Sequence, residues 1–74
     1  MDTLEIRLQA PVLFDQSIGY WTGEPDRAAL ARALAAVPEH PDVERAIDDA
    51  GVLLRGPAEA VHIMARLLRE AGLE

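Results

Sequence analysis

The chain has 74 residues, which allows one domain around one hydrophobic core, and a domain of this size buries only about 60% of its unfolded surface. It has no cysteine, which excludes disulfides and thiolate metal sites, and its 50% hydrophobic content is too high for a disordered chain. Its net charge of −6 argues against duplex nucleic acid and anionic membranes as partners, because both attract clustered cations. We therefore expect a single compact domain over residues 1–74.

The first ten residues lack the basic start and apolar stretch of a secretory signal, and no apolar run approaches the roughly 20 residues of a membrane span. The expected location is cytoplasmic. All the basic residues are arginine and alanine is abundant, a composition typical of GC-rich bacterial genes.

The segment 3–9 predicts a β-strand. Leu4, Ile6 and Leu8 alternate with polar residues, which is the pattern of a strand with one buried and one solvated face. Pro11 ends this strand because proline cannot donate to a β-ladder. Residues 12–14 then suggest a bend and residues 17–21 a short strand paired with the first, although the whole region 11–22 is also compatible with a loop.

Three segments that open with a proline predict helices, because proline is favoured at the first helical position. They span residues 25–37, 41–50 and 57–71. In the second, apolar residues recur at helical spacing and Gly51 follows as a stop signal. These residues are Val43, Ala46, Ile47 and Ala50. In the third, the stripe expected to face inward comprises Ala60, Val61, Met64, Leu67, Leu68 and Ala71.

Between the last two helical segments, residues 51–57 read GVLLRGP, a short apolar run between glycines that predicts a buried strand of about four residues. The expected order is therefore strand, hairpin strand, helix, helix, strand, helix. This order predicts an α+β domain in which three short helices pack on one face of a small two- or three-stranded sheet.

No catalytic, cofactor-binding or metal site is expected. His62 shares the polar side of the last predicted helix with Arg66 and Arg69, as on an ordinary solvated surface. His40 and His62 lack the spacing of metal ligands, and Ser17 lacks the glycines of a nucleophile elbow. We therefore expect a protein that is not an enzyme and carries no cofactor.

Two charged segments are candidate binding sites. Asp42, Asp48 and Asp49 lie in the acidic stretch 39–49, which either attracts a basic partner or simply keeps a small protein soluble. Arg55 and Gly56 precede a predicted helix start and could hold an anion, although Pro57 removes one N–H donor there. The structural alternative is that Gly56 only lets the chain turn sharply.

The aromatic pair Tyr20 and Trp21 is the third candidate. Consecutive residues of a strand point to opposite faces, so one aromatic is expected in the core and the other at the surface. We expect Tyr20 to pack with Ile18 and Trp21 to meet a partner, since tryptophan and tyrosine are enriched at interface hot spots. Packing of both in the core and a small-ligand pocket remain alternatives.

The sequence thus favours a non-enzymatic protein–protein interaction module, a small acidic accessory or regulatory subunit that binds another protein or forms an oligomer with itself. The residues expected at the partner are Tyr20, Trp21, Asp42, Asp48 and Asp49. The alternative is a small-ligand or anion-binding domain that uses Arg55 and Gly56.

Overall fold

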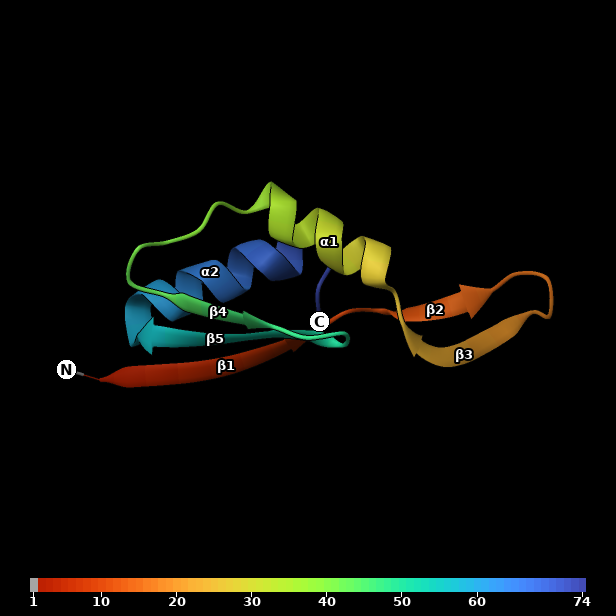
Figure 1. The fold of residues 1–74 in the computed structure, drawn as a ribbon, viewed down its shortest axis with the longest axis horizontal. Coiled ribbons are helices and arrows are strands. Elements are labelled where there is room, and N and C mark those ends of the chain that lie inside the picture. Colours follow the sequence, from red (N-terminus) through yellow and green to blue (C-terminus); the bar gives the residue numbers. More distant parts are fainter. Residues whose placement is uncertain (1) are drawn as a thin grey trace.

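The computed structural model describes residues 2–74, and these residues form an α+β fold with two helices and two separate antiparallel sheets (Figure 1). The elements in chain order are β1 (Thr3–Gln9), β2 (Val12–Asp15), β3 (Tyr20–Pro25), α1 (Arg27–Ala36), β4 (Glu44–Ile47), β5 (Gly51–Pro57) and α2 (Ala58–Glu70). One sheet has three strands in the order β1-β5-β4, and the other is the β2–β3 hairpin. The α+β class is confirmed, whereas the expectation of a single sheet is wrong.

The core lies between the three-stranded sheet and the two helices. Val52 and Leu54 of the central strand β5 are fully buried and stand beside Leu8 and Ile6 of β1. The strands predicted at 3–9 and 51–57 are therefore confirmed. From the helices, the apolar side chains that complete the core are Leu30, Ala33, Val61, Met64, Ala65 and Leu68.

Both helices begin close to the predicted residues, but their first turns differ from the prediction. Asp26 is the N-cap of α1, and its carboxylate accepts a hydrogen bond from the N–H of Ala29 at 3.0 Å. Pro57 is the residue before α2. The first N–H of this helix, that of Ala58, donates to the carbonyl of Asp2.

In the part of the chain that the structure describes, neither helix has the length and apolar content needed to cross a membrane.

The helix predicted at 41–50 is wrong, because these residues contain strand β4 and the turn that joins it to β5. The carboxylate of Asp48 accepts hydrogen bonds from the N–H groups of Ala50 and Gly51, at 2.8 and 2.9 Å. A side chain that bonds the backbone two and three residues ahead stabilises a turn instead of a helix. The β4 backbone then pairs with β5, and Ile47 lies opposite Val52.

The β2–β3 hairpin projects from one end of the body, along the long axis of the molecule (Figure 1). The molecule measures 49 × 19 × 17 Å, and the hairpin accounts for its elongation. A hydrogen bond of 2.8 Å from the N–H of Asp26 to the carbonyl of Pro11 joins the two chain segments at the base of the hairpin. The region 11–22, left open between strand and loop by the sequence, thus belongs largely to a separate ribbon. The expected pairing of residues 17–21 with the first strand is wrong, because β3 begins at Tyr20 and pairs with β2.

Gly56 gives a test of this architecture. A methyl group at this position would collide with the backbone carbonyl of Asp42, in the segment that leads into β4. We expect Gly56→Ala to lower the free energy of unfolding by about 1–3 kcal/mol, the usual effect of overpacking. In urea denaturation, the neighbouring control Arg55→Ala should cost less than about 1 kcal/mol, because Arg55 is exposed. Equal stability of Gly56→Ala and wild type would contradict the observed path of residues 41–43.

Candidate protein-interaction surface

The turn of the β2–β3 hairpin is built by Asp15. Its carboxylate accepts hydrogen bonds from the hydroxyl of Ser17 at 2.6 Å and from the N–H of Ser17 at 2.9 Å. Its carbonyl accepts from the N–H of Gly19, which has a φ of 70°, a conformation that favours glycine. The Ser17 hydroxyl, followed by the Ser17 N–H, holds the pKa of Asp15 below its ordinary value. Local hydrogen bonds therefore define the end of the hairpin.

An aromatic pair spans the hairpin. Phe14 of β2 lies opposite Trp21 of β3, and their ring centroids are 5.0 Å apart at an interplanar angle of 63°. Such edge-to-face pairs contribute about 0.5–1.5 kcal/mol beyond the area they bury. The pair stiffens the ribbon, yet Trp21 remains 63% exposed.

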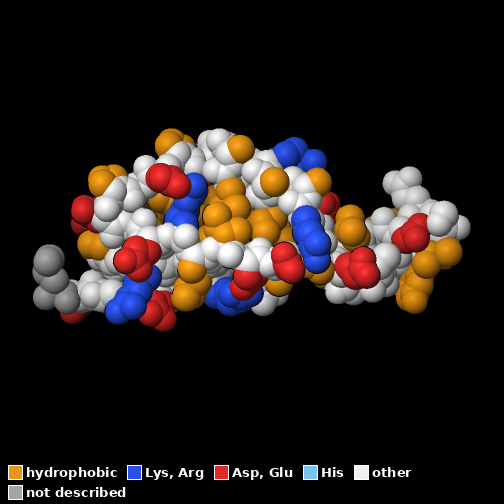
Figure 2. Space-filling model, viewed as in Figure 1, with side chains coloured by type: hydrophobic (Ala, Val, Ile, Leu, Met, Phe, Trp, Pro, Cys, Tyr) orange, Lys and Arg blue, Asp and Glu red, His pale blue; other side chains and the backbone are white. Residues whose placement is uncertain are grey.

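Large apolar side chains are concentrated on this hairpin and lie open to solvent. Of the nine large hydrophobic residues that are exposed in residues 2–74, six lie between positions 12 and 21. We call these six the hairpin surface: Val12, Leu13, Phe14, Ile18, Tyr20 and Trp21. Figure 2 shows apolar side chains at the free end of the hairpin. Large exposed apolar patches are characteristic of interaction sites in soluble proteins, so the hairpin surface is the candidate site.

The expectation that Tyr20 is buried against Ile18 is wrong. Tyr20 is 63% exposed and Ile18 is 61% exposed, so both aromatics of the pair Tyr20–Trp21 are at the surface. The reason is that β2 and β3 form their own two-stranded sheet, which has no helix layer on either face. Alternation along β3 therefore places Tyr20 and Trp21 on two solvated faces.

The acidic residues do not form one surface. Asp48 and Asp49 lie in the β4–β5 turn, whereas Asp42 lies at the other end of β4. Asp48 forms an ion pair with Arg7 at 2.9 Å, and Asp49 contacts Arg27 at 3.6 Å. Asp48 and Asp49 thus take part in a turn and in intramolecular ion pairs. The helix predicted to carry all three acids is absent from residues 2–74.

Arg55 and Gly56 lie within β5 and not in a turn before a helix. Arg55 points to the face of the sheet opposite the helices, where its Nε lies 3.5 Å from the carboxylate of Glu5. Asp42 and Glu44 line the same shallow depression. One guanidinium among three carboxylates is an unfavourable site for an anion.

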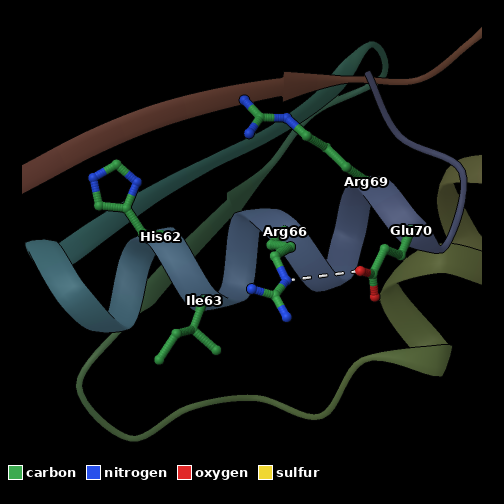
Figure 3. A pocket seen from close by; sticks show the side chains of 5 residues that line it. All are labelled: His62, Ile63, Arg66, Arg69 and Glu70. Carbon is green, nitrogen blue, oxygen red and sulfur yellow. Dashed lines mark ion pairs between the residues drawn. The ribbon is translucent and has the colours of Figure 1, made fainter.

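A second surface lies on the outer side of α2. His62, Ile63, Arg66, Arg69 and Glu70 line a shallow recess, which we call the α2 recess (Figure 3). In Figure 3, His62 and Arg69 point to one side of the helix and Ile63 points to the other, while Arg66 pairs with Glu70 at 3.7 Å.

Helical spacing predicted the polar residues on the exposed side of α2, but it did not predict that apolar residues are exposed there as well. Ile63 is 57% exposed, and Leu67, expected to face inward, is 42% exposed. The residues that sequence reasoning missed on the hairpin are Val12, Leu13 and Phe14. Their signal was present, because three consecutive apolar residues in a strand cannot all face one core.

Comparison with protein-family models, with curated proteins and with solved structures found no match to this chain.

The Asp48 carboxylate should make the stability of the fold depend on pH. Hydrogen bonds from the N–H of Ala50, followed by the Arg7 side chain, lower its pKa in the folded state. A lowered pKa means that Asp48 stabilises the fold above its unfolded pKa of about 3.9, and that this contribution is lost as the pH falls through the folded value. Urea denaturation between pH 7 and pH 2 should therefore show a smaller loss of stability for Asp48→Asn, which keeps the turn acceptor but does not titrate.

Asp49→Asn is the matched control, because the Asp49 carboxylate contacts only Arg27 at the surface among the ion pairs described for residues 2–74. It should retain the pH dependence of the wild type. Identical pH profiles for Asp48→Asn and wild type would show that the turn does not depend on the charge of Asp48.

Proposed function

We propose that the chain is a non-enzymatic interaction module that binds a protein chain through the hairpin surface. The observation that carries the proposal is the position of the aromatic residues. All three aromatic residues of the sequence, Phe14, Tyr20 and Trp21, lie exposed on a hairpin that projects from the body. Tryptophan and tyrosine are the residue types most enriched at the energetic centres of protein interfaces.

The construction of the hairpin also supports binding. An isolated two-stranded hairpin is marginally stable in water and gains stability when a further strand, helix or surface covers one face. No buried hydrophobic residue lies between Ala10 and Leu30, so the body does not supply that cover. A bound partner would supply it.

The total surface of the molecule is consistent with a missing partner. The accessible area is 5090 Å². A compact monomer of 8.1 kDa is expected to expose roughly 4,500 Å². The difference, about 600 Å², reflects the projection of the hairpin from the body, which leaves both of its faces accessible to a partner. Because the whole chain has only 74 residues and a net charge of −6, we propose that it is a small acidic accessory or regulatory subunit.

Affinity capture tests the proposal. Tagged wild type and tagged Trp21→Ala are each produced in cells that also make the untagged chain, and the recovered proteins, untagged copies included, are quantified by mass spectrometry. We expect Trp21→Ala to reduce recovery of the partner at least tenfold, since a hot-spot residue contributes about 2 kcal/mol or more.

Ile47→Ala is the matched control, because Ile47 is a comparably exposed apolar residue on β4, away from the hairpin. It should leave recovery unchanged, and circular dichroism should show that both variants are folded. Equal recovery with Trp21→Ala and wild type would refute the role of the hairpin surface.

A further inference from the structure

We infer that the partner of the hairpin is a second copy of this chain, with the hairpin surface of each copy docked on the α2 recess of the other. The inference rests on the proposed function of the hairpin and adds the identity of the partner and the surface that receives the hairpin. It follows from the chemistry, the dimensions and the placement of the two surfaces.

The two surfaces are chemically complementary. The hairpin, residues 12–25, carries the aromatic side chains and two charged residues, Asp15 and Glu24, both acidic. The α2 recess carries the exposed side chain of Ile63, Arg66 in an ion pair with Glu70, and Arg69 on the other side of the helix from Ile63 (Figure 3). Guanidinium groups stack on the faces of tryptophan and tyrosine, and this attraction is worth about 0.5–2 kcal/mol. The recess therefore offers apolar contact at Ile63 and a guanidinium group at Arg69 to an acidic aromatic ribbon, whereas Arg66 is already paired with Glu70.

The hairpin is also long enough to cover the recess. Strand β3 has six residues and extends about 20 Å at ~3.3 Å per residue. The α2 recess lies on residues 62–70 of helix α2, which extend about 13 Å at 1.5 Å per residue. A hairpin laid along α2 would therefore cover the whole recess.

The hairpin cannot reach the α2 recess of its own chain in this structure, because it extends away from the body (Figure 1). Two copies placed side by side in opposite directions would each present the hairpin to the α2 of the other. Such an exchange has two-fold symmetry and repeats the same contact twice, which is the commonest arrangement of homo-oligomers.

The closing experiment uses two variants of the full chain. The hairpin variant carries Tyr20→Ser and Trp21→Ser, and the recess variant carries Ile63→Ser and Arg66→Ser, all at exposed positions. Sedimentation equilibrium should give a dimer of 16.2 kDa, twice 8.1 kDa, for wild type and for the control Ile47→Ser. Each double variant alone should be monomeric, because either change removes both symmetric contacts.

Mixing the two double variants restores one of the two contacts, since one chain retains the hairpin surface and the other retains the recess. The recess variant then contains the only tryptophan in the mixture. We expect its emission to shift to shorter wavelength when the hairpin variant is added, and not when more recess variant is added. No shift, or a dimer that the recess substitutions leave intact, would overturn the inference.

A photo-crosslinking phenylalanine analogue in place of Phe14, whose ring lies beside Trp21, decides the matter if either double variant fails to fold. Crosslinks between copies should fall within residues 59–70, and crosslinks elsewhere or none would overturn the inference. Failure of this inference can be distinguished from failure of the proposed function. If the chain stays monomeric and Trp21→Ala loses a captured protein other than this chain, only self-association is refuted. A dimer that also forms without Trp21 overturns the inference, whereas the wider proposal is overturned only if Trp21→Ala recovers every captured protein as wild type does.

Discussion

The structure depends on the central position of β5. This strand pairs with β1 on one edge and with β4 on the other, and α2 follows it directly at Pro57. Val52 and Leu54 are fully buried beneath the helices, so the same residues join the sheet and the helical layer. Gly51 and Gly56 flank them at points where the backbone of Leu8 and the backbone of Asp42 approach too closely for a side chain.

A consequence of this arrangement is that the hairpin lies outside the core. Within residues 2–74, the first buried apolar residues are Leu8 and Ala10, and the next is Leu30. Residues 11–29 contribute no buried apolar residue to the core. The core around β5 thus contains no side chain of the hairpin, and the exposed aromatic side chains take no part in it. The core and the surface proposed for recognition therefore lie in different parts of a short chain.

Sequence patterns predicted the elements in which local signals agree. The alternation of Leu4, Ile6 and Leu8 and the apolar run around Val52 are unambiguous, and both strands are present. Residues 41–50 carried conflicting signals, because Val43 and Ile47 fit a helical stripe whereas two acids at the end of a helix oppose its dipole. Asp48 instead bonds the backbone of the β4–β5 turn. The unfavourable charge at this position was the evidence for a turn.

The sequence by itself determined the α+β class, the central strand, both helices and the concentration of aromatic residues in one segment. Only the tertiary structure decided that Tyr20 and Trp21 are both exposed, because exposure depends on whether another layer covers the strand and not on alternation within it. It also separated Asp42 from Asp48 and placed Arg55 beside Glu5, since strand pairing joins residues that are far apart in the chain. Local spacing predicts the direction of a side chain relative to its neighbours, whereas the packing of distant segments decides what that side chain meets.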